Sequence, residues 1–95
     1  MLFRWNVEKN KKLIAERNIS FDEIQEAIEA DCLIDAKVNT KEEYEHQIRL
    51  LVLINGYIWE VPSIVLQDKP KVFYFVTAFK NRKENSKYWS SQNEK

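Results

Sequence analysis

The dipeptide Asn55-Gly56 constrains the fold more than any other part of this sequence, because it separates two apolar runs, 48–54 and 57–66. Asn-Gly between such runs is the strongest short-range signal for a β-hairpin, since a type I′ turn requires positive φ at both central residues. Gly56 is also the single glycine of the chain, so no other residue can adopt a left-handed turn at so little cost. We therefore expect a hairpin centred on this turn.

A third apolar run extends the predicted hairpin into a sheet. It covers 72–79 and follows the polar segment 67–70 (Gln-Asp-Lys-Pro), which is typical of a turn between strands. The three runs together predict a three-stranded antiparallel sheet. Pro62 lies inside the second run and lacks an amide hydrogen, so it marks a bulge, an edge or a strand end.

The N-terminal residues predict an edge strand followed by a first helix. Residues 2–5 alternate with period two, and Asn6 is a good N-cap for a helix over 7–17. The apolar stripe of this helix consists of Val7, Leu13 and Ile14. Because the stripe is thin, the helix must depend on docking against the rest of the domain.

A second helix is predicted by a capping box. Ser20 can accept a hydrogen bond from the backbone of Glu23, and the helix then runs to about Ala30. Its apolar residues recur at helical spacing: Phe21, Ile24, Ala27 and Ile28. Residues 32–38 resemble a further short strand, and the charged residues 41–47 are expected to form a loop into the hairpin.

This order of elements predicts an α+β domain in which two N-terminal helices pack on one face of an antiparallel β-sheet, with a short C-terminal helix. Ninety-five residues are enough for one domain. We expect that domain to span 1–89, with a flexible C-terminal tail at 90–95. The opposite face of the sheet is expected to stay free as a concave binding surface.

Charge and cysteine content narrow the classes of function. Fifteen basic and fifteen acidic residues cancel, so the chain is not a general polyanion binder. Residues 21–47 hold nine acids against two bases, whereas 79–95 hold five bases against two acids. A single cysteine (Cys32), with no apolar signal segment and no run long enough to cross a bilayer, predicts a cytoplasmic protein without membrane partners. With one cysteine and one histidine, neither a metal site nor a cofactor is expected.

A further pattern of short segments runs through nearly the whole chain. These segments are 3–6 (Phe-Arg-Trp-Asn), 9–10 (Lys-Asn), 17–23 (Arg-Asn-Ile-Ser-Phe-Asp-Glu), 44–47 (Tyr-Glu-His-Gln), 55–57 (Asn-Gly-Tyr), 61–62 (Val-Pro), 81–83 (Asn-Arg-Lys) and 87–88 (Lys-Tyr). In this order they resemble the BrnT-like toxin family, whose members open with F-x-W-[DN] and continue through K-N and R-x-I-S-F-x-[ED]. Family toxins often carry a histidine where Asn18 stands here, and a more basic tail.

The resemblance implies a compact member of the RelE/ParE toxin superfamily of type II toxin–antitoxin systems. BrnT-like members are regarded as metal-independent ribonucleases. The implied partners are a cognate antitoxin protein and RNA, either free or on the ribosome. DNA would be contacted only through the antitoxin.

RNA cleavage without a metal requires help in removing the 2′-hydroxyl proton, cations for the phosphorane charge and an acid for the leaving oxygen. Arg82 is the expected phosphate ligand, because guanidinium groups bind phosphate bidentately, and Tyr88 lies in the same basic cluster. His46 carries the only imidazole, the group best suited to proton transfer near neutral pH. These three residues are the catalytic candidates.

Five more residues are candidates for RNA binding. Lys80, Lys83 and Lys87 can hold neighbouring phosphates. Arg49 can reach the same surface from the hairpin strand, or it can pair with Glu60. Trp89 and Tyr88 can stack on unpaired bases.

Each of these assignments also has a purely structural interpretation. The cluster can equally be a solvated helix surface with Tyr88 and Trp89 packed on the sheet, and His46 an exposed residue among acids. Two functions therefore stay open: an endoribonuclease toxin, or a catalytically inactive RelE-like module that only binds a protein partner, which zero net charge favours. A homodimer through exposed strand edges is a third interpretation.

Overall fold

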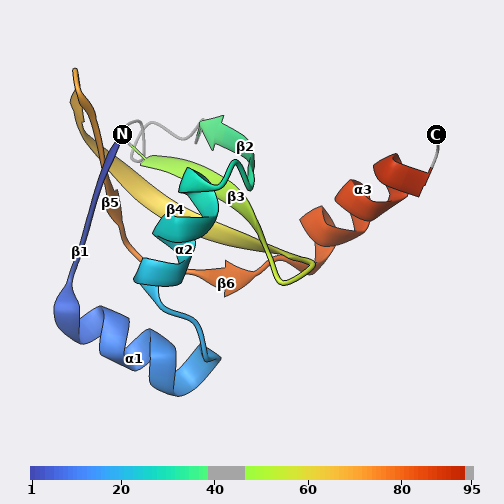
Figure 1. Ribbon diagram of the computed structural model, residues 1–95, viewed down its shortest axis with the longest axis horizontal. Coiled ribbons are helices and arrows are strands. Elements are labelled where there is room, and N and C mark those ends of the chain that lie inside the picture. Colours follow the sequence, from blue (N-terminus) through green and yellow to red (C-terminus); the bar gives the residue numbers. More distant parts are fainter. Residues whose placement is uncertain (39–46, 94–95) are drawn as a thin grey trace.

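The structure is a computed structural model that describes residues 1–38 and 47–93 (Figure 1). The elements are β1 (Leu2–Trp5), α1 (Val7–Arg17), α2 (Phe21–Glu29), β2 (Leu33–Val38), β3 (Gln47–Ile54), β4 (Tyr57–Asp68), β5 (Lys71–Phe75), β6 (Phe79–Lys80) and α3 (Arg82–Asn93). The strands form a sheet in the order β1-β5-β4-β3-β2, and the short strand β6 pairs with β4. The fold is therefore α+β, as the order of sequence patterns predicts.

The central hairpin has the predicted turn. Ile54 pairs with Tyr57 across two intervening residues, and those residues, Asn55 and Gly56, have φ of 50° and 79°. Two positive φ values are what a type I′ turn requires. The resulting register places Val52 opposite Trp59 and Leu50 opposite Val61.

The sheet is mixed, so the prediction of a purely antiparallel, three-stranded sheet is wrong. β1 pairs in parallel with β5, from Leu2 opposite Val72 to Trp5 opposite Phe75. A parallel pair needs a long connection, and here the helices, β2 and the hairpin all lie between the two strands. The sequence predicts strands at 2–5 and 32–38, and both form. It does not predict the parallel pairing of β1, because the partner strand β5 lies about seventy residues further along the chain.

The third predicted strand is interrupted opposite Pro62. Ser63 of β4 pairs with Phe75 of β5, and Glu60 pairs with Phe79 of β6, so residues 76–78 lie outside both strands. Pro62 has no amide hydrogen to donate, and its carbonyl accepts from Val76 at 2.9 Å. The predicted run 72–79 therefore divides into two strands.

Other predicted boundaries differ locally. The turn expected at 67–70 is confined to 69–70, because β4 extends through Asp68. Gln47 begins β3 rather than ending a loop, and 41–46 lie outside the described residues. The helix α3 continues to Asn93, so most of the tail predicted at 90–95 is helical.

The main core lies between α1, α2 and one sheet face. Its buried members are Phe3, Leu13, Ile19, Phe21, Ile24, Ile28, Leu50, Val52, Trp59, Val61, Phe73, Phe75 and Ala78. The predicted apolar face of α2 is confirmed, and Ser20 accepts from the Glu23 amide at 3.1 Å. Of the stripe predicted for α1 only Leu13 is buried, while Val7 and Ile14 are exposed. The helix is also held by Asn10, whose side-chain oxygen accepts from the Phe21 amide at 2.8 Å.

The face of the sheet opposite this core is not left free, which corrects the prediction. Residues of β2, β3 and β4 whose side chains alternate with the core residues point to that face. The first turns of α3 lie there, with Glu84 of α3 at 2.7 Å from Lys37 of β2. Charged residues of the sheet hold this helix. Local hydrophobicity does not identify such residues as part of an interface.

Replacing Gly56 by Val should destabilise the protein by about 1–2 kcal/mol, because a β-branched side chain resists positive φ. The cost is conformational, since a Cβ at Gly56 meets no atom within 4 Å. Thermal unfolding measures the change, and Gly56→Asn, which tolerates this backbone region, is the matched control. Equal melting temperatures for Gly56→Val and the parent would contradict the turn assignment.

Candidate functional site

The docking of α3 is dominated by one buried carboxylate. Glu84 is 9% exposed, and its Oε2 lies 2.7 Å from Lys37 Nζ. Its Oε1 lies 3.7 Å from Lys87 Nζ. The hydrogen bond from Lys37 lowers the pKa of the Glu84 carboxyl, more than burial raises it, and the charges of Lys37, Lys87 and Arg49 lower it further. Glu84 therefore remains ionised and offsets part of the positive charge of Lys37 and Lys87.

A second carboxylate, Glu60, anchors the start of α3. Glu60 is 6% exposed, and its Oε1 lies 3.2 Å from Arg49 Nη1. The Asn81 side chain donates to the same oxygen at 2.8 Å, and its own oxygen accepts from the Glu84 amide at 2.9 Å. Asn81 thus caps α3 while fixing that helix to β4. The Arg49–Glu60 ion pair is the second of the two arrangements that the sequence leaves open.

These contacts divide the predicted RNA-binding cations. Arg49 and Lys87 each lie beside a buried carboxylate, so much of their charge is offset within the fold. Lys80, Arg82 and Lys83 have no carboxylate within 4.0 Å in the part of the chain that the structure describes. Lys80, Arg82 and Lys83 stand within four consecutive positions at the junction of β6 and α3, and all three are exposed.

Tyr88 lies on a different side of α3 from the first cations of that helix, whereas Trp89, seven residues after Arg82, lies on nearly the same side as Arg82. Tyr88 is half-buried and lines a hollow with Lys37, Glu84 and Lys87, as expected for residues four apart on a helix. Trp89 packs edge-on against Tyr88 and donates to the Gly56 carbonyl at 3.2 Å. Arg82 and Lys83 are exposed, more than 90° away from Tyr88 around the helix at 100° per residue. His46 lies outside the described residues.

Lys80 belongs instead to the helix-covered side, where it lines a hollow that the sequence does not predict. The residues lining this hollow, of about 230 Å³, are Arg17, Asn18, Ile19, Glu23, Ile54, Asn55, Tyr57, Trp59 and Lys80. An adjoining hollow of about 360 Å³ shares Arg17, Trp59 and Lys80 and adds Phe79. We call these two adjoining hollows together the cationic hollow.

Both cations of the cationic hollow are positioned by neutral groups. The Arg17 guanidinium donates to the Ala78 carbonyl and, at 3.4 Å, to the Thr77 hydroxyl. The Lys80 ammonium lies 5.2 Å from the centre of the Tyr57 ring and 5.8 Å from that of Trp59, within range of a cation–π interaction. Carbonyl, hydroxyl and ring hold a cation in place without cancelling its charge. The arrangement therefore suits an anion.

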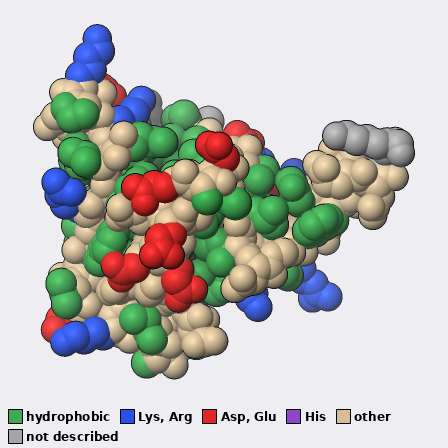
Figure 2. Space-filling model, viewed as in Figure 1, with side chains coloured by type: hydrophobic (Ala, Val, Ile, Leu, Met, Phe, Trp, Pro, Cys, Tyr) green, Lys and Arg blue, Asp and Glu red, His purple; other side chains and the backbone are tan. Residues whose placement is uncertain are grey.

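Carboxylates gather elsewhere on the same side of the molecule. Figure 2 shows acidic side chains over α2 and basic ones towards the margins of the view, including below the start of α3. The exposed acids of α2 are Asp22, Glu23, Glu26 and Glu29. Glu23 lines the cationic hollow, and its Oε1 lies 3.3 Å from the Ser20 hydroxyl of the capping box. An anionic strand would accordingly approach over β6 and the start of α3.

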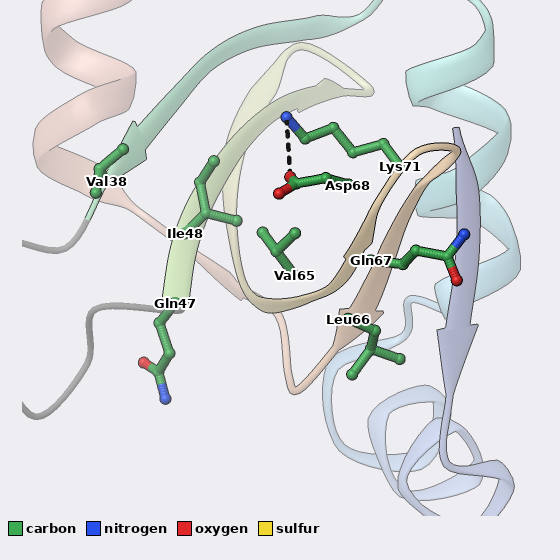
Figure 3. A pocket seen from close by; sticks show the side chains of 8 residues that line it. All are labelled: Val38, Gln47, Ile48, Val65, Leu66, Gln67, Asp68 and Lys71. Atoms are coloured by element: carbon green, nitrogen blue, oxygen red, sulfur yellow. Dashed lines mark ion pairs between the residues drawn. The ribbon is translucent and has the colours of Figure 1, made fainter.

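A hollow at the other end of the sheet has different chemistry (Figure 3). It has a volume of about 350 Å³ and a mainly apolar wall that includes Val38, Ile48, Val65 and Leu66. Its lysine, Lys71, pairs with Asp68 at 3.9 Å. Since this charge is offset, the hollow offers an anion less than the cationic hollow does.

Two further observations bear on the class of protein. Within 1–38 and 47–93, no three His, Cys, Asp or Glu side chains are grouped as they would be to hold a metal ion. None of the helices in those ranges has the length and apolar character needed to span a bilayer. The sequence matches no protein-family model, and no curated protein matches it.

The sequence conceals the cationic hollow because its parts are distant in the chain. Arg17 ends α1, Tyr57 and Trp59 begin β4, and Lys80 ends β6. The pairing of Trp59 with Lys80 and the hydrogen bonds of Arg17 to Thr77 and Ala78 bring them together, and that pairing follows from the interruption at Pro62. Arg17 and Tyr57 do occur among the residues that carry the family resemblance, which is the available signal.

The lowered pKa of Glu84 predicts a pH-dependent stability. Because ionised Glu84 stabilises the folded state, its contribution is complete above the ordinary glutamate pKa, near 4.5, and is lost as pH falls through the lowered folded value. Glu84→Gln should cost about 1–3 kcal/mol at pH 7, and its deficit should shrink in acid. Urea unfolding between pH 7 and 3 measures this, with exposed Glu16→Gln as control. A deficit that is the same at every pH would contradict the ionised Glu84 network.

Proposed function

We propose that this protein is a BrnT-like toxin of a type II toxin–antitoxin system, with a RelE/ParE-like arrangement, that cuts RNA without a metal ion and so inhibits translation. The observation that carries the proposal is the set of exposed cations Lys80, Arg82 and Lys83 at the β6–α3 junction, none beside a carboxylate of the described residues. The α+β fold and the ordered family resemblance support it. A cognate antitoxin would silence the toxin by covering this cationic surface.

In this proposal Arg82 binds the scissile phosphate. Its guanidinium offers paired donors to two phosphate oxygens and can stabilise the charge that accumulates on phosphorus. Lys83 holds a neighbouring phosphate. Tyr88, a catalytic candidate of the sequence, lies on another side of α3 in the hollow beside Glu84, so it has no contact with this phosphate in the proposal. Asn81 and Glu60 act by positioning, because they fix the start of the helix that presents Arg82.

The proposal predicts cleavage by the protein alone. Purified protein should cut a reporter messenger RNA in the presence of EDTA, leaving a 2′,3′-cyclic phosphate at the 3′ end of the upstream fragment and a 5′-hydroxyl on the downstream fragment. Its induction in a bacterial host should arrest growth. Intact RNA together with undisturbed growth would refute the proposed toxin activity.

The proposal also assigns Arg82 as the ligand of the scissile phosphate. Loss of a charged phosphate contact costs about tenfold or more in transition-state binding. Arg82→Ala should lower the cleavage rate by that factor and leave the melting temperature unchanged, since Arg82 is exposed. Lys71→Ala is the matched control, as it removes a cation at the far end of the sheet. Full cleavage by folded Arg82→Ala would remove Arg82 from the site.

One observation favours the second candidate, a catalytically inactive RelE-like module that only binds a partner protein. Buried Glu60 and Glu84 offset Arg49, Lys37 and Lys87, so part of the predicted RNA surface serves to hold α3. For this candidate, replacing Arg82 and Lys83 by Ala would abolish complex formation with the small DNA-binding protein expected in the neighbouring reading frame. RNA would remain uncut by either form of the protein. Co-purification and the cleavage assay together separate the two functions.

A further inference from the structure

We propose that the cationic hollow binds one nucleotide unit of single-stranded RNA, with a phosphate between Arg17 and Lys80 and a base against Tyr57. This inference rests on the proposed function, and it adds a subsite away from α3. It also gives roles to Arg17 and Tyr57, neither of which belongs to the cluster at 80–89.

The first argument is preorganisation of uncompensated charge. Arg17 is oriented by a backbone carbonyl and a hydroxyl, and Lys80 by two aromatic rings. No carboxylate of the described residues lies within 4.0 Å of either cation. Cations that bind an anion best are already in place and are not neutralised before it arrives. Lys37, Lys87 and Arg49 lack this property, because each lies beside a carboxylate.

The donors that remain suit a phosphate. The recorded bonds of the Arg17 guanidinium both leave from Nη1, and guanidinium carries five N–H donors in a planar fork. The other donors can meet phosphate oxygens in the paired geometry that arginine favours. The Lys80 ammonium, a compact charge, can contact the same group from the other wall of the hollow.

The aromatic lining favours a nucleotide over an acidic peptide. Tyr57 is partly exposed and Trp59, at 7% exposure, forms a buried floor. Aromatic surface next to cations is how proteins hold single strands, because bases stack on rings while cations follow the phosphates. Asn18 and Asn55 also line the hollow and can hydrogen-bond a base edge. Lys80 is two residues from Arg82, so the same strand can continue from the hollow onto the start of α3.

The test uses a uridine hexanucleotide (rU6) and the full-length protein. Wild-type protein should bind rU6 with a shift of the Trp59 indole N–H resonance, because the phosphate sits beside the cation over that ring. Lys80→Ala and Arg17→Lys should each weaken binding by about tenfold. Lys12→Ala removes an exposed cation from the outer surface of α1 and should bind as the parent does. Melting temperatures identify any variant that does not fold, and for Arg17 the charge-conserving change limits that risk.

Three results would overturn the inference. Binding of rU6 by Lys80→Ala and Arg17→Lys at the level of Lys12→Ala would show that the hollow is not used, whereas cleavage and growth arrest by the wild type would still support the toxin. Absence of rU6 binding by the wild type would also exclude the subsite, and growth arrest then decides separately whether the proposed function survives. If Lys80→Ala and Arg17→Lys failed to form a complex with the neighbouring DNA-binding protein but bound rU6 as the parent does, the hollow would be assigned to an acidic peptide segment of that partner.

Discussion

The register of the β3–β4 hairpin is the constraint on which the rest of the structure depends. Side chains alternate between the faces of a sheet, so a slip of one residue would exchange the two faces. With Ile54 opposite Tyr57, the core side receives Leu50, Val52 and Trp59. The other side receives Arg49 and Glu60, which hold the start of α3. The same register places Trp59 beside Lys80 of β6. The turn at Asn55-Gly56 therefore determines both the packing of α3 and the existence of the cationic hollow.

Ion pairs with buried carboxylates distinguish the cations that hold the fold together from the cations that can bind a ligand. The protein has no net charge, and overall composition alone argues against RNA binding. The structure distributes that charge unevenly, because buried Glu60 and Glu84 lie beside Arg49, Lys37 and Lys87 and offset part of their positive charge. Arg17 and Lys80 are instead held by neutral groups. A protein of zero net charge can thus present a local cationic surface, which is what the proposed binding of RNA requires.

The sequence predicts the elements whose signals are local. Ser20 caps α2, Asn6 caps α1 through a 2.9 Å bond to the Lys9 amide, and Asn55-Gly56 forms the hairpin turn. Each signal acts within a few residues, so no tertiary knowledge is required. The parallel pairing of β1 with β5 depends on backbone partners seventy residues away, which hydrophobic periodicity does not encode. Packing of Tyr88 and Trp89 on the sheet is one interpretation of the sequence, but the contacts of Asn81 and Glu84 that hold α3 are not predicted, because hydrophobic periodicity does not identify polar and charged interfaces.

The candidate site shows the same limit. Clustering in sequence identified Lys80, Arg82 and Lys83, and the structure leaves them exposed. It also grouped Lys87 and Tyr88 with them, although a helix turns by about 100° per residue and so divides such a cluster between faces. Arg17, Tyr57 and Trp59 join Lys80 only through the fold. The sequence therefore shows which residues are cationic and close together in the chain. Their partners in the fold decide which of those cations can bind a ligand.

The salt dependence of RNA binding tests this division of cations most directly. Each lysine that contacts a phosphate of a single strand contributes about −0.7 to the slope of log affinity against log salt. Lys80→Ala should reduce the magnitude of the slope for rU6 by about 0.7. Lys87→Ala should reduce it less, because Glu84 lies 3.7 Å from that ammonium and offsets part of its charge. A slope that falls in Lys87→Ala and not in Lys80→Ala would contradict the account.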